Sequence, residues 1–143
     1  MTRPLDPPKG FHRVERPRRN PFNELVGPFH ERREGETVTL GLRIEERHLN
    51  SRGFCHGGLL ATLADLALGY ALVGQGDRIA GSFFTVQLSI DYASPAKVGD
   101  WIESEVEIQQ AGARLAFANC YLVAAGRRIA RASAIFARTG KNE

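Results

Sequence analysis

One stretch of the sequence decides the fold, and it reads HGGLLATLADLALGYALVGQ over residues 56–75. Large apolar residues recur in it at the spacing of an α-helix, at Leu59, Leu63, Leu66, Tyr70 and Val73. The other faces are also mainly apolar, with Leu60, Ala61, Ala64, Ala67, Leu68, Ala71 and Leu72. A helix that is apolar all round is buried all round. We therefore expect one long central helix from about His56 to Gln75.

The rest of the chain predicts β-strands before and after this helix. Apolar and polar residues alternate with the period of a strand, most clearly from Phe84 to Tyr92 and from Ile102 to Gln109. The expected strands cover residues 29–34, 37–44, 84–92, 102–109, 115–123 and 127–138, and a short helical turn covers residues 21–26. Gly112 and the Ala125-Gly126 pair supply hairpin turns. The pattern indicates an α+β fold in which a curved antiparallel sheet wraps around the one helix.

The chain divides into an N-terminal arm and one domain, and 143 residues fit a single core. Residues 1–21 contain six of the nineteen Lys and Arg residues and five of the seven prolines. Such a segment has little apolar surface to bury, so we expect a flexible arm over residues 1–21 and a folded domain over residues 22–140. Residues 22–143 contain thirteen basic and fourteen acidic residues, which argues against a nucleic-acid-binding domain.

The cysteines and the hydropathy pattern bear on the compartment. Cys55 and Cys120 form neither a disulfide framework nor a CxxC metal motif, which favours a reducing compartment. No stretch has the length of a membrane span, and the N-terminus lacks the apolar core of a secretory signal. We expect a cytoplasmic protein without a metal site.

Asp65 is the residue that does not fit a core helix. It is the only Asp, Glu, Lys or Arg between Arg52 and Asp77. Burying an unpaired carboxylate costs several kcal/mol by rough estimate, so something must compensate for it. One interpretation is structural: the carboxylate bonds to a neighbouring strand or faces solvent at the helix edge. The other is a catalytic carboxylate with a pKa tuned by burial.

The start of the helix is polar and rich in glycine, and it reads NSRGFCHGG over residues 50–58. Free N–H groups in a first helical turn attract negative charge, such as the oxyanion of a thioester under attack. An ordinary glycine-rich loop is the alternative. Gly57 and Asp65 are eight residues apart, about 12 Å along a helix axis, so they reach one substrate only from different subunits.

With these residues the sequence resembles the hotdog-fold thioesterase superfamily, in its branch of PaaI-like phenylacetyl-CoA thioesterases. The similarity rests on Asn50, the HGG of residues 56–58, the LAD of residues 63–65 and the SPAKVGD of residues 94–100. It covers about residues 22–140 and implies a hotdog fold that assembles as a dimer of dimers. The arm of residues 1–21 departs from the family's pattern.

The resemblance implies a role for each matching residue. Gly57 supplies an oxyanion-hole amide, and Asp65 of the facing subunit is the base or the nucleophile. Asn50 and His56 support the thioester and the loop, and Thr85 helps hold the attacking water. The expected activity is hydrolysis of an acyl-CoA, aryl or fatty acyl, to free acid and CoA, with no cofactor. The expected assembly is a homodimer that forms a homotetramer.

Further residues are candidates for substrate binding, and two rival functions stay open. The candidates are Gly58, Phe83, Phe84, Lys97 and Arg128, the last two for the phosphates of CoA. A Cys55–His56 nucleophile pair is disfavoured, because adjacent side chains diverge on a helix. The rivals are a hotdog hydratase or dehydratase and a non-catalytic acyl-CoA-binding sensor. The sensor would not need an ionisable residue at position 65.

Overall fold

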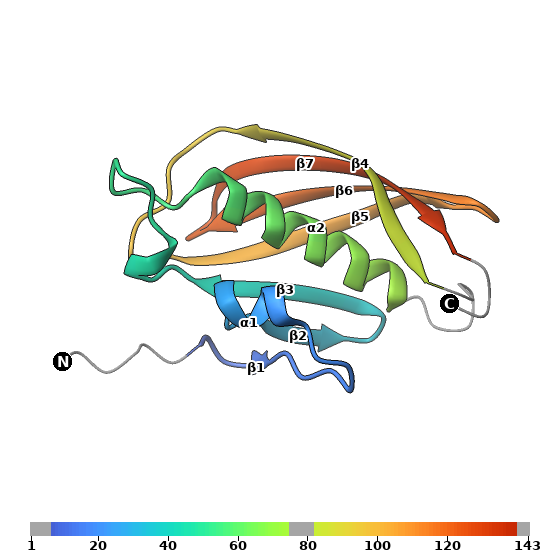
Figure 1. Ribbon diagram of the computed structural model, residues 1–143, viewed down its shortest axis with the longest axis horizontal. Helices are drawn as coiled ribbons and strands as arrows, with labels where there is room; N and C mark the ends of the chain where they lie inside the picture. The colour runs from blue at the N-terminus through green and yellow to red at the C-terminus, as the bar shows by residue number, and fades with distance from the viewer. Residues whose placement is uncertain (1–6, 75–81, 140–143) are drawn as a thin grey trace.

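The computed structural model describes residues 7–74 and 82–139, and its centre is one long helix in the hollow of a curved antiparallel sheet (Figure 1). The helices are α1 (Pro21–Val26), a 3-10 turn (Glu46–His48) and α2 (Gly57–Val73). The strands are β1 (His12–Arg13), β2 (His30–Glu34), β3 (Thr37–Arg43), β4 (Phe83–Tyr92), β5 (Trp101–Ala111), β6 (Leu115–Ala124) and β7 (Arg127–Arg138). The predicted α+β class and sheet-around-helix architecture are confirmed.

The sheet has seven strands in the order β1-β2-β3-β5-β6-β7-β4, and all neighbours are antiparallel. Every predicted strand is present, with ends within about two residues of the expected ones, and the two-residue strand β1 was not predicted. Ala125 and Gly126 both have positive φ, 49° and 75°, as a tight hairpin between β6 and β7 requires. Because β4 is an edge strand, one side of its backbone has no neighbouring strand in the described chain.

One side of α2 and the concave face of the sheet form the core. Fully buried leucines of α2 meet fully buried residues of β3, β5, β6 and β7. They include Leu63, Leu68, Leu72, Leu42, Ile102, Leu122 and Ile129. Burying one side chain of this kind stabilises the folded state by roughly 1.5–3 kcal/mol. The burial of several such leucines therefore holds α2 against the sheet.

The prediction that α2 is buried on every side is wrong for the single chain. Val73 is 66% exposed, and Asp65, Leu66 and Tyr70 are only partly buried. The neighbouring edge strand β4 is open as well, with Phe84 53% exposed. The sheet of one chain therefore leaves apolar residues on this side of α2 partly or largely exposed.

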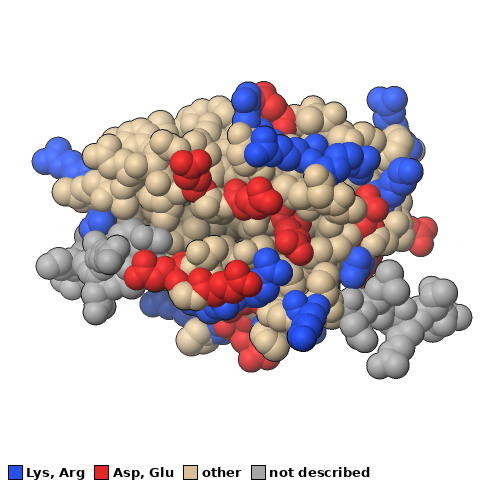
Figure 2. All heavy atoms as spheres, turned by 180° about the vertical axis from the view of Figure 1, so that it is seen from behind, with Lys and Arg blue, Asp and Glu red and all other residues tan. Residues whose placement is uncertain are grey.

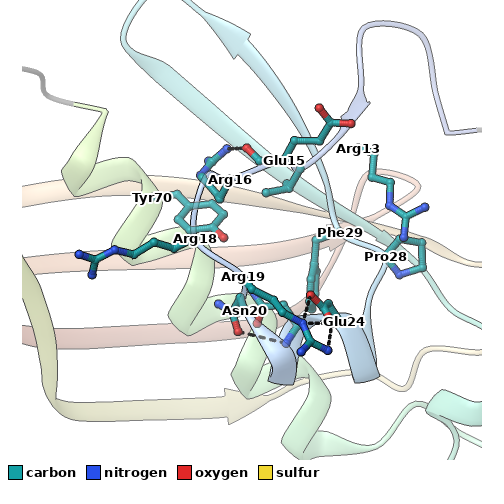
Figure 3. A pocket seen from close by; sticks show the side chains of 12 residues that line it. Arg13, Glu15, Arg16, Arg18, Arg19, Asn20, Glu24, Pro28, Phe29 and Tyr70 are labelled. Atoms are coloured by element: carbon teal, nitrogen blue, oxygen red, sulfur yellow. Dashed lines mark hydrogen bonds and ion pairs between the residues drawn. The ribbon is translucent and has the colours of Figure 1, made fainter.

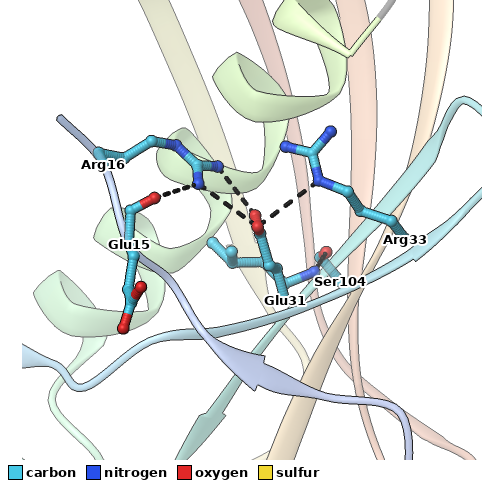
Figure 4. A network of polar contacts seen from close by, with 6 residues as sticks. Glu15, Arg16, Glu31, Arg33 and Ser104 are labelled. Carbon is cyan, nitrogen blue, oxygen red and sulfur yellow. Dashed lines mark hydrogen bonds and ion pairs between the residues drawn. The ribbon is translucent and has the colours of Figure 1, made fainter.

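Residues 7–20 make specific contacts with the domain. Phe11 is buried, with its ring centroid 5.0 Å from that of Trp101. Arg16 forms an ion pair with Glu31 of β2 at 2.8 Å, and Arg33 approaches the same carboxylate at 3.5 Å (Figure 4). The expected flexibility of the arm, and the boundary at residue 21, stay predictions.

The molecular surface mixes charges of both signs. Positive and negative side chains are interspersed on the face seen in Figure 2, rather than gathered into one basic stripe. Arg131 and Asp91, for example, form an exposed ion pair at 2.7 Å. No helix of the described residues is both long and apolar enough to cross a membrane.

Candidate active site

Asp65 lies on the open side of α2 and reaches toward β4. Its Oδ1 accepts a hydrogen bond of 2.6 Å from Thr85 Oγ1. Asp65 is half-buried rather than fully buried, so the expectation of a carboxylate in the core is corrected. The carboxylate is hydrogen-bonded to a neighbouring strand, as the structural interpretation of Asp65 expects. It also faces a surface opening, which a catalytic carboxylate needs.

A surface cavity of about 500 Å³ opens beside this pair. Its lining is Asp65, Thr85, Ala61, Thr62, Leu66, Leu88, Asn20, Phe22 and Asn23. The first six come from α2 and β4, and the last three come from α1 and the residue before it. A half-buried carboxylate with one fixed oxygen, at the edge of a cavity lined by both apolar and polar side chains, is a suitable position for a base or a nucleophile.

An irregularity in β4 lies at Thr85. Pairing with β7 runs from Thr85 opposite Phe136 directly to Gln87 opposite Ile135, which leaves Val86 as an extra residue. Such a β-bulge bends the strand and redirects the side chains beside it. Here the bulge is next to the residue that holds Asp65.

The start of α2 has the free amide that the sequence predicts. Nδ1 of His56, the residue before the helix, accepts a 2.8 Å hydrogen bond from the Gly58 N–H. Since Nδ1 is an acceptor, the proton of a neutral His56 ring is on Nε2. No described residue accepts a hydrogen bond from the Gly57 N–H. The Gly57 amide therefore remains available to an outside acceptor, with the positive end of the helix dipole behind it.

Tyr92 was not predicted as a site residue, and the structure places it against Gly57. Its hydroxyl donates a 2.7 Å hydrogen bond to the Gly57 carbonyl oxygen. A Cβ at position 57 would lie 3.2 Å from the Tyr92 ring and hydroxyl, so a larger residue there would push against the tyrosine. The alternating pattern showed Tyr92 only as the end of a strand, and nothing in that pattern pairs it with a residue 35 positions earlier.

Asn50 and His56 belong to one compact loop. The Asn50 side-chain oxygen accepts hydrogen bonds from the N–H groups of Arg52 at 2.9 Å and Phe54 at 3.3 Å. The loop is fixed further by the His56 N–H, which donates to the His48 carbonyl oxygen at 2.8 Å. The Asn50 oxygen thus shapes the loop, and its amide nitrogen is the part of the side chain suited to donate to a substrate.

Cys55 lies beside this loop but is poorly suited to act as a nucleophile. The residue is buried, and burial raises the pKa of its thiol to about 11. The reactive form of cysteine is the thiolate, which such a pKa suppresses at neutral pH. Within residues 7–74 and 82–139, no three His, Cys, Asp or Glu side chains gather as metal ligands would.

A single chain brings the predicted residues together in two groups. Asp65 and Thr85 form one group, and Asn50, His56, Gly57 and Gly58 form the other around the start of α2. Gly57 and Asp65 are eight residues apart on the same straight helix, about 12 Å along its axis. The two groups of one chain therefore do not meet on one reacting carbonyl.

The predicted substrate-binding residues beyond Gly58 do not line the Asp65 cavity. Phe83 packs under Arg138, whose guanidinium carbon is 5.4 Å from the ring centroid, and Phe84 is exposed on β4. Lys97 lies in the turn that Asp100 closes through a 2.9 Å bond to the Lys97 N–H. Arg128 lies over the ring of Tyr121 at 3.8 Å. The roles given to these residues stay predictions.

Comparison with known proteins identifies the family. A family model described as the thioesterase superfamily matches residues 52–130, which include both groups of candidate residues except Asn50. The chain belongs to the thioesterase superfamily. It is thus an enzyme of the thioester-hydrolase class, as the sequence resemblance predicted.

Individual superfamily members agree with this assignment. A Pseudomonas aeruginosa protein named "Putative esterase PA0474" is 38% identical over 133 residues, which cover 92% of this chain and 97% of that protein. Human acyl-coenzyme A thioesterase 13 is 37% identical over 96 residues, covering 66% of this chain and 67% of that one. The Escherichia coli PaaI protein of the phenylacetic acid degradation operon has a TM-score of 0.75 at 20% identity, covering 85% of this chain and 86% of that one. That similarity confirms the predicted hotdog fold.

Proposed function

We propose that this superfamily member hydrolyses an acyl-CoA to free acid and CoA in a site shared by two subunits. Asp65 of one subunit acts on the thioester carbonyl, and the Gly57 N–H of the other stabilises the oxyanion. The observation that supports this most is the pair of separate half-sites: a carboxylate fixed by Thr85 at a cavity, and an unpartnered amide at the start of the same helix.

The chemistry follows from the geometry of Asp65. Thr85 occupies Oδ1, which leaves Oδ2 to take a proton from water or to attack the carbonyl. In the first route, hydroxide adds to the carbonyl carbon, the C–S bond breaks, and the thiolate of CoA leaves with the proton. In the second, Asp65 attacks the carbonyl carbon, the C–S bond breaks and the thiolate of CoA leaves, and water then hydrolyses the resulting mixed anhydride to the free acid and the Asp65 carboxylate. Either route passes through an oxyanion that the Gly57 amide is suited to stabilise.

The open side of the chain supports a dimer. The edge strand β4 exposes backbone hydrogen-bonding groups and large apolar side chains, with Phe84 53% and Val86 55% exposed. A second copy docked β4 to β4 around a two-fold axis would continue the sheet and cover the open side of α2. That pairing sets Asp65 opposite Gly57 of the partner subunit. We further propose that two such dimers form a tetramer.

The remaining candidates take positions around the thioester and the CoA. Asn50 and His56 orient the thioester from the loop before α2, and Gly58 allows the substrate to approach the backbone. Phe83 and Phe84 contribute apolar surface near the dimer edge, while Lys97 and Arg128 contact phosphates of CoA. Both cysteines are free thiols, which fits a protein of the reducing cytoplasm.

The experiment is release of free thiol from a panel of acyl-CoA esters by the purified protein and by Asp65→Asn. The substitution keeps the shape of the side chain but removes the base, so kcat should fall about 10²- to 10⁴-fold. Asp91→Asn is the matched control, because Asp91 is an exposed aspartate of β4 that forms an ion pair with Arg131 of β7. The Asp91→Asn variant should keep wild-type kcat. Binding without thiol release by the wild type would indicate a sensor, and addition of water to an unsaturated acyl chain would indicate a hydratase.

A further inference from the structure

The two edges of the sheet differ in how much backbone they leave open. β4 forms one edge along its ten residues, with no strand beyond it in the described chain. At the other edge, β2 is covered by β1, a strand of only two residues from the N-terminal arm. An uncovered edge is a template for pairing with another chain. A two-residue strand has little pairing of its own, so other contacts must hold it against β2.

The arm follows the first half of β2. The two residues of β1 pair in antiparallel register with His30 and Glu31. The next N–H group of the arm, that of Val14, donates to the Phe29 carbonyl oxygen at 2.9 Å. The arm thus lies along residues 29–31 and covers the backbone there that a second chain would otherwise reach.

On the convex face of the sheet, the residue before β1 is buried. Phe11 is 5% exposed, and its ring meets that of Trp101 edge to face, with the centroids 5.0 Å apart. Trp101 comes directly before Ile102 of the core, so its side chain lies on the opposite face of β5. The guanidinium carbon of Arg32 is 4.7 Å from the centroid of the Phe11 ring. Phe11 therefore holds the start of β1 on the convex face.

On the concave side, Arg16 joins the arm to the central helix. Its two terminal nitrogens donate to the two carboxylate oxygens of Glu31 in β2, at 2.8 and 3.3 Å. The same guanidinium covers the ring of Tyr70 in α2, with its carbon 4.6 Å from the centroid (Figure 3). The Glu31 side chain is only 16% exposed, so this paired contact is shielded from water more than an ordinary surface ion pair.

We infer that residues 11–16 form a strap that closes the β2 edge of the sheet and reserves the β4 edge for pairing with a second copy of the chain. The strap passes from Phe11 on the convex face, around the edge, to Arg16 on the concave side, so it is held on both faces. A chain with two open edges could add copies at both, whereas a chain with one open edge stops at a two-fold dimer.

The inference rests on the proposed function in one respect, because the dimer through β4 is part of that proposal. It goes beyond it by giving a role to the arm, which precedes the residues that match the family model.

The first test loosens the strap in the full-length chain with Phe11→Ala/Arg16→Gln. Amide hydrogen exchange in residues 30–34 should become at least about tenfold faster, because a loosened edge opens locally. Light scattering after size exclusion should show species heavier than the wild type, and their share should grow with protein concentration. Arg16→Gln alone keeps Phe11 and should show both changes on a smaller scale, so it replaces the double variant if that protein does not fold.

Arg18→Gln is the matched control for both measurements. Arg18 belongs to the same arm, is exposed, and points away from Tyr70 (Figure 3). The exchange of β2 and the mass of the assembly should therefore stay at the wild-type values in this variant.

A second substitution identifies the edge that pairs. Val86 lies on β4 and is 55% exposed, so Val86→Lys places a charge on that edge. In the otherwise wild-type chain, Val86→Lys should lower the mass of the assembly. In the Phe11→Ala/Arg16→Gln chain, the added association should survive Val86→Lys, because it uses β2.

Unchanged exchange of β2 in a folded Phe11→Ala/Arg16→Gln protein would overturn the inference. So would faster exchange without heavier species, or heavier species that Val86→Lys abolishes. Thiol release from acyl-CoA is measured on the same samples. A wild type that releases no thiol, combined with the expected masses, would retain the strap and refute the proposed hydrolysis. Hydrolysis by the wild type, combined with unchanged masses in the loosened variants, would refute the strap and leave the hydrolysis in place.

Discussion

Thr85 Oγ1 donates a 2.6 Å hydrogen bond to Asp65 Oδ1, and this bond joins the middle of α2 to the bulged part of β4. It fixes one carboxylate oxygen and therefore the direction of the other. Thr85→Val keeps the size of the side chain and removes the donor, whereas Thr85→Ser keeps the donor. A hydrogen bond to a charged group is worth about 1.5–3 kcal/mol, so Thr85→Val should lower kcat roughly 10- to 100-fold.

The measurement is steady-state thiol release by both Thr85 variants, with circular dichroism as a check on folding. Thr85→Ser should keep kcat within a few-fold of the wild type. A folded Thr85→Val protein with wild-type kcat would show that this bond does not position the carboxylate for catalysis.

Two substitutions of Gly57 test whether its amide donates a hydrogen bond to the oxyanion, because one lacks the N–H group and the other keeps it. Gly57→Pro removes the N–H, and proline is tolerated at the first position of a helix. His56 is already extended, at φ −61° and ψ 132°, as the residue before a proline prefers. Gly57→Ala keeps the N–H, and the Cβ of either residue meets Tyr92 at 3.2 Å, so alanine controls for that contact.

The proline variant should lose about 10²-fold or more in kcat relative to the alanine variant, as when one oxyanion donor is removed. The comparison uses kcat at saturating acyl-CoA, together with melting temperatures for both proteins. Equal turnover by the two variants would mean that the Gly57 amide does not contact the oxyanion.

His48 connects pH to stability. It is buried, its Nδ1 accepts from the Glu45 N–H at 2.9 Å, and burial is the main cause that lowers its pKa below the usual 6.5. The folded state therefore favours the neutral ring, and the unfolded state binds a proton more readily. This contribution to stability is complete above about pH 6.5 and is lost as the pH falls toward the lower pKa of the folded state.

Urea unfolding at pH 7, 6 and 5 should show a steeper loss of unfolding free energy for the wild type than for His48→Gln. The difference has a ceiling of about 1.4 kcal/mol per pH unit, the value for one proton. Burial also lowers the pKa of His30, but that contribution is common to both proteins and cancels. Parallel stability curves over this range would rule out His48 as the titrating group.

The sequence predicted most of the fold because its apolar periods are strong and local. The pattern from Leu59 to Val73 identified the helix, and Asp65 was noticeable because it interrupts an apolar segment. The polar, glycine-rich start of the helix indicated Gly57, and the family resemblance added Thr85. Each of these features can be recognised in a short stretch of sequence or from a known spacing between residues.

The rest depends on contacts between distant parts of the chain. The open side of α2 escaped prediction, because an apolar face looks the same whether a sheet or a second subunit covers it. The place of α1 depends on bonds from Arg47 and His48, more than 20 residues later, to its last carbonyl oxygens. A six-residue helix has no periodicity that reveals what it covers.

The shared site is the central claim, and mixing two inactive variants tests it most directly. Neither Asp65→Asn nor Gly57→Pro alone can assemble a working site. A hybrid dimer of the two has one site with both defects and one site with neither. After denaturing and refolding an equal mixture, random pairing makes about half of the dimers hybrids with one working site of two, so acyl-CoA hydrolysis should recover to about a quarter of wild type. Hybrids confirmed by mass that regain no activity would contradict the shared site and place all of its parts within one chain.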